Sequence, residues 1–314
     1  MCRSAVFSCL FLLAGLLPGP VPGAEPPKRP WEDLDGIRCW NQRLFTPWLR
    51  AEVDRLRKDG RLVAKDQLVK GAKEKHLAPA LPRLPAADAP LSPPALADKL
   101  RAGVVLVMSL NDKGKDNYGS GFAVADDLVV TNWHAFGLHP ELPDVVVVDH
   151  AGHVLPVIAA PASDPGSDLV VLRVAGKLDG LPVAEKPPPA GERLWQMGHT
   201  HMALWAFTEG IVNRYCVENF VPDGAKESRD MIVMDISHEI SKGSSGSPLV
   251  NDRGEICGVY FRSRWYYQDA TNKITGGDGA AANALVLKDR YVLYERNMCV
   301  PLSRLRDLLG WGKP

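Results

Sequence analysis

The sequence has no excess of charge of either sign, since 37 Lys and Arg residues are balanced by 37 Asp and Glu residues. A surface that binds nucleic-acid phosphates leaves a basic excess, so nucleic acid is not an expected partner. The chain also lacks a C-x-x-C pair, which argues against a structural zinc site. The closely spaced pairs His150/His153 and His199/His201 have no matched third ligand. We therefore expect no metal and no cofactor.

Beyond residue 24, no segment is apolar enough to cross a bilayer. The most apolar stretch, residues 5–17, follows Arg3 and precedes the prolines and small residues of PGPVPGAE. This pattern predicts a signal peptide over residues 1–24. The mature chain is then expected to be secreted or periplasmic, with no membrane insertion after signal removal. A buried or anchoring N-terminal helix is the alternative.

Cysteine is scarce, and export would make disulfides possible. Removal of the signal leaves Cys39, Cys216, Cys257 and Cys299, which allow three pairings if two bridges form. Cys257 and Cys299 lie in apolar, strand-like runs, so they fit buried thiols as well as they fit bridges. The sequence leaves the pairing open.

Residues 25–94 differ from the remainder of the chain in composition and in the spacing of their apolar residues. Leu49, Val53 and Leu56 recur at helical spacing in a charged stretch that ends at an Asp-Gly pair. The Pro/Ala-rich run LAPALPRLPAADAPLSPPA follows, and such runs are typical of stiff spacers between units. We therefore predict an accessory helical segment and a linker. An alternative interpretation of the same region is a propeptide or a docking arm.

From about residue 95 onward, short β-branched runs alternate with Gly, Pro, Asn and Asp, and no helical pattern intervenes. Such spacing is typical of an all-β sandwich or barrel. The length fits one unit of two closely packed barrels. At the end, residues 302–311 place four leucines on one helical face, which predicts a short closing helix.

The stretch ISKGSSGSPLVNDRGEICGVYF, residues 240–261, holds four serines within seven positions. A serine becomes a nucleophile only when a base takes its proton and donors await the oxyanion. His134 follows one apolar strand and Asp168 precedes another, so together they can supply the base and its orienting carboxylate. The chain order His, Asp, Ser is that of chymotrypsin-type barrels, while subtilisins and α/β-hydrolases follow other orders.

The motifs GSGFAV, TNWHAF, SDLVVLRV and KGSSGSPLV resemble those of trypsin-like serine peptidases of the HtrA (Deg) type. The resemblance covers most of residues 96–311 and implies a trypsin-like double β-barrel, with barrels at about 95–190 and 191–312. It also implies that His134 is the general base, Asp168 its orienter and Ser245 the nucleophile. The oxyanion hole would be formed by the backbone N–H groups of Gly243 and Ser245.

The resemblance has limits. Peptidases of this type usually carry a PDZ domain after the protease, and none is expected here because few residues follow the closing helix. An oligomer remains possible, but the trimer common in that family does not carry over, because the N-terminal region differs. The long segment 262–297 is expected to form a loop or hairpin beside the substrate pocket, and our hypothesis is that it acts as a lid over the cleft.

Substrate-binding residues follow from the same resemblance. Glu239 aligns with the base of the specificity pocket, where a carboxylate would favour Lys or Arg at the cleaved position. If Glu239 instead turns to solvent, small aliphatic side chains would be preferred. Strand residues Gly258, Val259 and Tyr260 are expected to pair with the substrate backbone.

The expected function is therefore that of a serine endopeptidase acting on protein or peptide substrates through an acyl-enzyme. Two alternatives stay open. A protease-fold module could have lost activity and serve in binding or regulation. An esterase could use the same triad on small esters.

Overall fold

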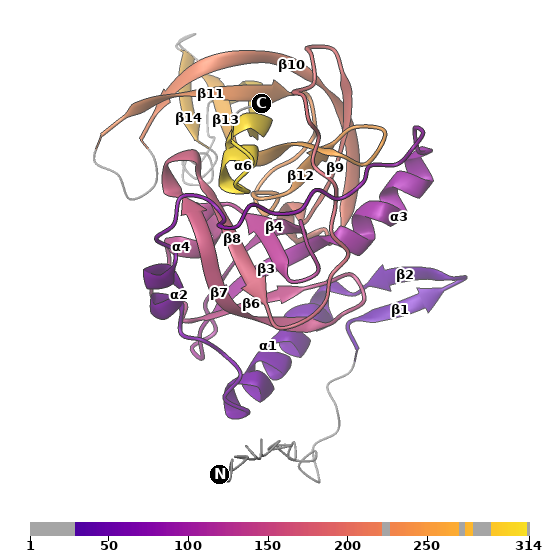
Figure 1. Cartoon of the computed structure of the whole chain (residues 1–314), viewed down its shortest axis with the longest axis vertical. Helices are drawn as coiled ribbons and strands as arrows, with labels where there is room; N and C mark the ends of the chain where they lie inside the picture. Colours follow the sequence, from indigo (N-terminus) through magenta and orange to yellow (C-terminus); the bar gives the residue numbers. More distant parts are fainter. Residues whose placement is uncertain (1–28, 222–226, 270–273, 279–289, 313–314) are drawn as a thin grey trace, which may run out of the picture.

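The structure is a computed structural model that describes residues 29–221, 227–269, 274–278 and 290–312. The expected signal peptide lies outside these residues. Within them, two β units are stacked on each other, with helices on their outer surfaces (Figure 1). No helix of the described residues is both long and apolar enough to cross a bilayer.

The first unit is a closed barrel with the strand order β3-β4-β5-β8-β7-β6. Its strands are β3 (Val104–Leu110), β4 (Asp116–Ala123), β5 (Leu128–Thr131), β6 (Asp144–Val148), β7 (Val154–Asp164) and β8 (Leu169–Val174). Side chains alternate across a strand, so Val105 and Val107 of β3 enter one hydrophobic cluster and Leu106 and Met108 enter another. Both faces of β3 are thereby buried, as its mostly apolar sequence predicts, and Ser109 is buried with them.

The second unit is a ring-like sheet with the order β12-β9-β10-β11-β15-β13-β14, and an additional pairing between β12 and β13 closes the ring. The strands are β9 (Arg193–Gly198), β10 (Ala206–Phe220), β11 (Arg229–Ile236), β12 (Pro248–Val250), β13 (Ile256–Asp269), β14 (Ile274–Asp278) and β15 (Arg290–Pro301). The predicted all-β, trypsin-like double barrel is confirmed.

The segment expected as a loop or hairpin, 262–297, is built in its described parts from β14 and the extended ends of β13 and β15. The lid function suggested for it stays a prediction, because residues 270–273 and 279–289 lie outside the described part of the chain. The closing helix is present as α6 (Leu302–Leu308), and its leucines are buried.

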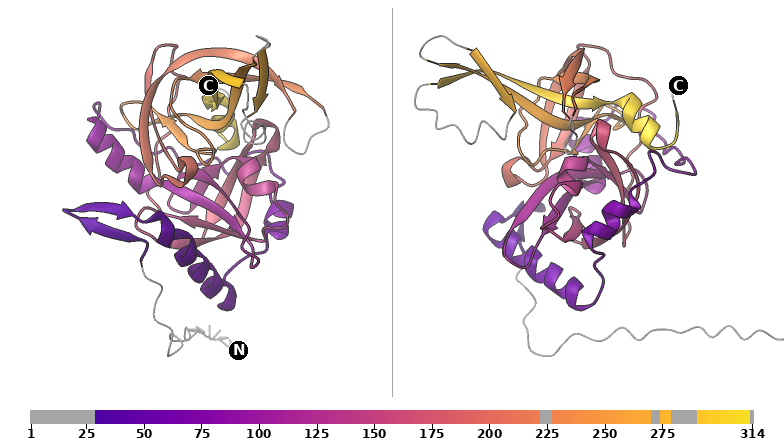
Figure 2. Two further views of the ribbon diagram at one scale, coloured as in Figure 1. Left: turned by 180° about the vertical axis from the view of Figure 1, so that it is seen from behind. Right: turned by 90° about the vertical axis from the view of Figure 1, so that its left-hand side faces the viewer.

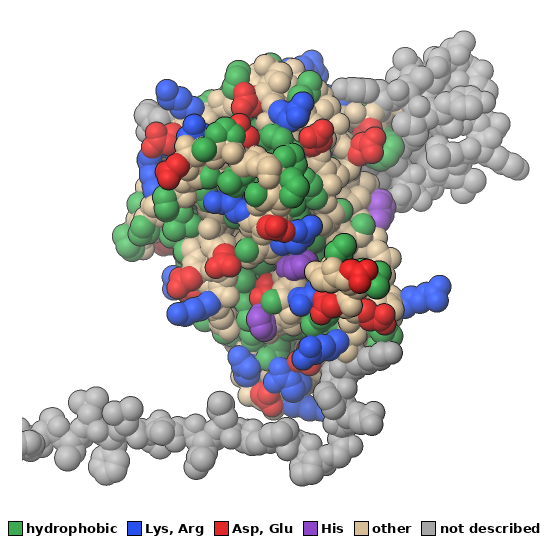
Figure 3. Space-filling view, turned by 90° about the vertical axis from the view of Figure 1, so that its right-hand side faces the viewer, with side chains coloured by type: hydrophobic (Ala, Val, Ile, Leu, Met, Phe, Trp, Pro, Cys, Tyr) green, Lys and Arg blue, Asp and Glu red, His purple; other side chains and the backbone are tan. Residues whose placement is uncertain are grey.

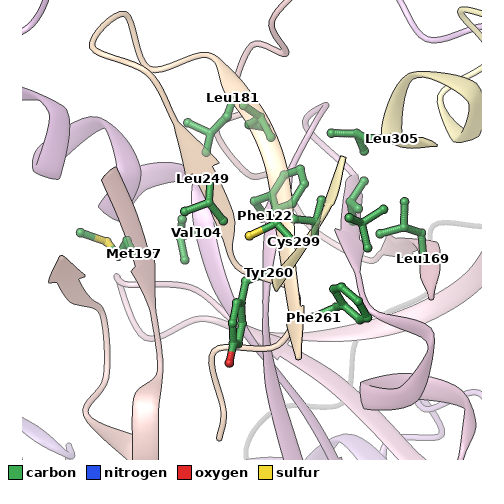
Figure 4. Close-up of a cluster of buried hydrophobic side chains, with 14 of the residues drawn as sticks. Val104, Phe122, Leu169, Leu181, Met197, Leu249, Tyr260, Phe261, Cys299 and Leu305 are labelled. Carbon is green, nitrogen blue, oxygen red and sulfur yellow. The ribbon is translucent and has the colours of Figure 1, made fainter. Parts of the chain in front are cut away.

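A single hydrophobic core joins the two barrels (Figure 4). Val104 and Phe122 of the first barrel belong to the same buried cluster as Met197, Leu249 and Cys299 of the second. Burial of apolar side chains is the main favourable term in folding. The shared core therefore fixes the two barrels against each other, and with them any site at their junction.

The N-terminal region forms a hairpin of β1 (Trp31–Leu34) and β2 (Ile37–Trp40), followed by α1 (Gln42–Lys58) and α2 (Lys65–Gly71). The Asn41 side chain accepts hydrogen bonds from the first backbone N–H groups of α1 and so caps the helix. Phe45, Leu49 and Val53 of α1 are buried in the cluster that joins the barrels. The helix, indigo in Figure 2, packs beside the first barrel and shares the protease core.

The Pro/Ala-rich run was expected to separate units, and instead it lies along the second barrel. Leu77 N–H donates to the Leu308 carbonyl at 2.8 Å, and Leu91 N–H donates to the Asp252 carbonyl at 2.8 Å. Between them, the Leu81 carbonyl accepts from the Trp311 indole at 2.5 Å. Residues 77–92 therefore form a strap that leads from α2 to α3 (Pro93–Gly103) across the second barrel. Composition alone did not show that its leucines dock.

All four cysteines of the described residues are free thiols, and Cys257 and Cys299 are buried. In the same part of the chain, no three His, Cys, Asp or Glu side chains surround a common point. On the face shown in Figure 3, basic and acidic side chains are interspersed.

Candidate active site

His134 and Asp168 are brought together at one end of the first barrel. His134 lies in the short helix α4 (Trp133–Gly137), which begins directly after β5. Its ring Nδ1 is 2.7 Å from Asp168 Oδ2, and its backbone N–H donates to Asp168 Oδ1 at 2.9 Å. Because an ionised carboxylate can only accept, the ring donates through Nδ1–H and leaves Nε2 as the acceptor in the neutral imidazole.

Asp168 is itself held in an unusual backbone conformation. It follows the short 3₁₀ turn Pro165–Ser167 and has φ 56° and ψ 41°, the left-handed region that Asp tolerates better than most residues. Its carbonyl accepts from Trp133 N–H at 3.1 Å and from Asn132 Nδ2 at 2.8 Å. Backbone and side chain of Asp168 thus both bind the segment 132–134 and fix the imidazole orientation.

A second Asp–His pair in the first barrel has the same local geometry. His153 Nδ1 is 2.7 Å from Asp149 Oδ2, and His153 N–H donates to Asp149 Oδ1 at 2.8 Å. The His153 side chain is 70% exposed, whereas that of His134 is 25% exposed. The Asp149–His153 pair lies in the turn of the hairpin formed by β6 and β7. Geometry of the pair alone therefore does not define a catalytic site.

Ser245 lies on a turn at the start of β12, in the second barrel. Its Oγ faces the Phe261 carbonyl at 3.5 Å, and its own carbonyl accepts from Ser120 N–H at 2.7 Å. Gly243 has φ +97°, and a Cβ there would come within 2.4 Å of the His199 carbonyl and of the Tyr118 ring. Only glycine fits this point of the turn.

The turn of Ser245 and the helix of His134 meet at Gly119 of β4. A Cβ on Gly119 would lie 2.9 Å from the Ala135 Cβ and 3.0 Å from the Ser245 carbonyl oxygen. Ala135 directly follows His134, so the two segments approach each other across one glycine. The junction between the barrels therefore holds His134, Asp168 and the Ser245 turn together.

Two N–H groups of the turn stay available for a ligand. Within the described part of the chain, Ser244, Gly246 and Ser247 N–H groups donate to backbone carbonyls, whereas those of Gly243 and Ser245 have no acceptor. In each of these two peptide groups, the carbonyl of the preceding residue accepts a hydrogen bond. Lys242 O accepts from His201 N–H, and Ser244 O accepts from Ser247 N–H. Because C=O and N–H of a trans peptide point in opposite directions, the two free N–H groups point away from these contacts.

The four serines of this stretch differ in their surroundings. Ser241 Oγ contacts His201 Nε2 at 3.2 Å, and Ser244 Oγ contacts the Thr200 hydroxyl. Ser247 Oγ donates to the Ser244 carbonyl at 2.6 Å. Among the described residues, Ser245 Oγ has only the long contact to the Phe261 carbonyl. Of the four, it is the hydroxyl that other side chains of the described residues leave uncommitted.

The expected substrate strand needs a correction. Gly258 and Val259 pair with β12 on one edge and with β15 on the other, and Tyr260 N–H donates to the Ser247 carbonyl at 3.0 Å. Their backbone groups are therefore occupied and cannot receive a substrate strand. Pairing with β12 ends at Val259 and pairing with β14 begins at Arg264. Among the described residues, this edge of β13 therefore has no partner strand after Tyr260, beside the Phe261 carbonyl.

The Glu239 side chain is exposed, although its neighbours His238 and Ile240 are buried. This position agrees with the alternative in which the carboxylate turns to solvent. The loop His199–Trp205, between β9 and β10, contacts the Ser245 turn through His201 and Thr200. Nothing in its GHTHM motif indicates this contact, because closely spaced histidines suggest only a metal site.

Comparisons with known proteins concern the fold of the chain. Residues 119–259 match the family model of the trypsin-like peptidase domain. No curated protein matches the chain. Among solved structures, the inactive form of a serine-to-alanine mutant of Rv3671c from M. tuberculosis H37Rv has a TM-score of 0.50 and 19% identity, with 73% of this chain and 95% of that chain covered.

A serine endoprotease from Yersinia pestis is also similar, with a TM-score of 0.45 and 19% identity over 63% of this chain and 65% of that chain. At such identities the likeness concerns the fold. The family match spans β4 to β13 and includes His134, Asp168 and Ser245. Over residues 119–259, the chain is therefore similar to the trypsin-like peptidase domain.

Proposed function

We propose that this protein is a secreted or periplasmic serine endopeptidase that cleaves protein or peptide substrates through an acyl-enzyme. One observation carries the proposal. His134, whose ring Nδ1 and backbone N–H both bind the Asp168 carboxylate, shares the barrel junction with a serine turn whose Gly243 and Ser245 N–H groups have no acceptor in the described residues. Acyl transfer requires a general base, a carboxylate that orients it, and two N–H donors that bind the oxyanion.

In the proposed reaction, Ser245 Oγ attacks the scissile carbonyl while His134 Nε2 takes the hydroxyl proton. Asp168 stabilises the imidazolium through Nδ1–H. The negative oxygen of the tetrahedral intermediate accepts from Gly243 and Ser245 N–H. His134 then protonates the leaving amine as the C–N bond breaks. A water molecule, deprotonated by the same imidazole, hydrolyses the ester and restores Ser245.

Substrate would bind as an extended strand at the edge of β13 beside Phe261, because main-chain pairing with a sheet edge suits any unfolded chain. Exposure of Glu239 supports the preference for small aliphatic residues at the cleaved position. Cleavage of a mixed peptide library by the wild type and by Glu239→Gln tests this preference. A wild-type preference for Lys or Arg that disappears in Glu239→Gln would instead place the carboxylate in the pocket.

Export is proposed from the charge and apolarity of residues 1–24. Expression of the whole chain in a bacterium, followed by N-terminal sequencing of the periplasmic fraction, tests it. We expect a mature chain that begins near residue 24 or 25. Recovery of the intact chain with Met1 in the cytoplasm or the membrane would contradict it.

The experiment for the activity compares the wild type with Ser245→Ala and with Ser303→Ala, which alters an exposed serine of α6. Each protein is treated with a fluorophosphonate reagent and, separately, with denatured casein. We expect labelling and cleavage for the wild type and Ser303→Ala, and neither for Ser245→Ala. No labelling of the wild type would favour a silent binding module. Labelling with turnover of small esters but intact casein would favour an esterase.

A further inference from the structure

The loop His199–Trp205, between β9 and β10, combines backbone strain with a central position. His201, Met202 and Trp205 have φ values of 47°, 64° and 53°, in the left-handed region that non-glycine residues avoid. Conformations of this kind are unfavourable and persist only where the surroundings impose them. Contacts outside the loop must therefore hold it.

On one side the loop holds the turn that carries Ser245. His201 N–H donates to the Lys242 carbonyl at 2.7 Å and thereby sets the plane of the 242–243 peptide group. Since the two polar groups of a peptide are fixed relative to each other, this bond also sets the direction of the Gly243 N–H. The Thr200 and Ser244 hydroxyls form a second contact between loop and turn.

Ser120 provides a third connection, through the first residue of the loop. Its Oγ donates to the Gly243 carbonyl at 2.8 Å and lies 3.0 Å from His199 Nδ1. Burial lowers the pKa of His199 to about 3, so the imidazole is neutral. Because the single hydroxyl proton is used on Gly243, His199 must donate from Nδ1–H, which leaves its ring oriented by Ser120.

On the other side the N-terminal region holds the loop. The indole of Trp40, at the end of β2, stacks on the indole of Trp205 with ring centroids 4.7 Å apart and an angle of 25°. Trp205 also donates from Nε1 to the Val104 carbonyl at 3.0 Å. Gln42, the first residue of α1, donates from Nε2 to the Met202 carbonyl at 2.8 Å. Trp40 and Gln42 thus bind two of the three strained residues.

We propose that the segment Trp31–Lys58 is a built-in activator of the proposed peptidase, in which Trp40 and Gln42 are positioning residues that hold the loop His199–Trp205 and, through it, the oxyanion donor of Gly243. The inference rests on the proposed function. It assigns to the segment the opposite role from an inhibitory propeptide. Loss of the contacts lowers activity under this proposal, whereas it would raise activity if the segment were inhibitory.

The test uses the full mature chain with Gln42→Ala, Trp40→Ala and Trp40→Phe. Gln67→Ala is the matched control, because Gln67 is an exposed glutamine of α2. The substrate is a fluorogenic peptide selected with the wild type from a mixed library. Displacement of a catalytic donor by about 1 Å can cost about 100-fold in rate. We expect kcat to fall about tenfold in Gln42→Ala and up to about 100-fold in Trp40→Ala, with KM within about twofold.

The conservative variant separates positioning from general damage. Trp40→Phe keeps an aromatic face for Trp205 and removes an indole N–H that is buried without an acceptor in the described residues. We therefore expect it to retain most of the wild-type kcat. Inhibition by a peptide aldehyde, whose adduct places an oxyanion at the Gly243 N–H, should weaken in Gln42→Ala by the same factor as kcat.

A second measurement does not depend on activity. Hydrogen exchange of the backbone amides of residues 241–245 should accelerate in Gln42→Ala and stay unchanged in Gln67→Ala. Unchanged kcat and unchanged exchange in Gln42→Ala would overturn the inference even if Trp40→Ala fails to fold, and so would a rise in kcat. Absence of labelling at Ser245 in the wild type, with faster exchange in Gln42→Ala, would overturn the proposed function and leave the coupling established.

Discussion

The Asp168 carboxylate binds two nitrogen atoms of one residue, the backbone N–H and the ring Nδ1 of His134, at 2.9 and 2.7 Å. The bond to the backbone fixes the carboxylate, and the bond to the ring fixes the tautomer. A neutral amide could keep the first bond and would spoil the second, because its NH₂ group would face Nδ1 and require it to accept.

Asp168→Asn therefore separates catalysis from folding. Asn tolerates the left-handed backbone of this position, so the fold should be kept. We expect kcat to fall by about 10⁴-fold because the imidazole takes the wrong tautomer. The measurement is peptide hydrolysis at neutral pH, together with thermal unfolding to show that the variant is folded.

The matched control is Asp149→Asn, in the pair that Asp149 forms with His153. The contacts there have the same lengths within 0.1 Å, but the histidine is exposed on a hairpin. We expect full activity from this variant. A comparable loss of activity in both variants would mean that the Asp–His geometry supports the barrel and that His134 is not specifically catalytic.

Gly119 is the point at which the His134 and Ser245 segments meet, so its replacement tests whether their spacing matters. In Gly119→Ala the added Cβ would lie 2.9 Å from the Ala135 Cβ and 3.0 Å from the Ser245 carbonyl. Both segments would have to move by a few tenths of an ångström. We expect at least a tenfold loss of kcat, because near-attack geometry tolerates little displacement.

Gly71→Ala is the control for the glycine replacement, since nothing lies within 4 Å of a Cβ at this last position of α2. Activity and thermal stability of Gly71→Ala should stay close to those of the wild type. Wild-type activity in Gly119→Ala would show that the junction has more room than its contacts indicate.

Much of the site could be predicted from sequence because its chemistry is local. His134 follows one strand and Asp168 precedes another, and β5 and β8 pair side by side. The barrel then brings the two residues together without further information. The turn around Ser245 could also be predicted from sequence, because glycine and small residues are required wherever backbone N–H groups converge.

Strand edges could not be predicted in the same way. An apolar run such as Gly258–Tyr260 shows that a strand is buried, but it does not show which neighbours occupy its two edges. Here β12 and β15 occupy both edges, and the edge that has no partner strand among the described residues begins one residue later. The docking of Trp40 on Trp205 was equally hidden, since the two residues are far apart in sequence and neither carries a motif.

The strap of residues 77–92 should be protected from proteolysis, unlike a spacer. Its Leu81 carbonyl accepts from Trp311 Nε1, and the Trp311 ring also faces the guanidinium of Arg83. Trp311→Phe removes the hydrogen bond, which contributes about 1 kcal/mol. We expect thermolysin under native conditions to cleave within the strap several-fold faster in Trp311→Phe than in the wild type. Rapid cleavage of the wild type at the same bonds would contradict docking.

His238 predicts an acid limit to stability. It is 1% exposed beneath β10, its Nε2 contacts the Leu194 carbonyl at 3.1 Å, and burial lowers its pKa to about 4. Between pH 6.5 and 4 the unfolded chain binds a proton here that the folded chain does not. The stabilisation is complete above pH 6.5 and is lost as the pH falls toward 4, by at most about 3 kcal/mol.

Urea unfolding between pH 7 and pH 4 measures this contribution. His238→Gln keeps an N–H donor for the Leu194 carbonyl and has no proton to gain, so its free energy of unfolding should fall less steeply with acid than that of the wild type. His153→Gln, at an exposed imidazole, serves as the control and should show the wild-type slope. Parallel curves for the wild type and His238→Gln would mean that His238 takes up its proton without unfolding, because the second barrel opens enough to hydrate Nδ1.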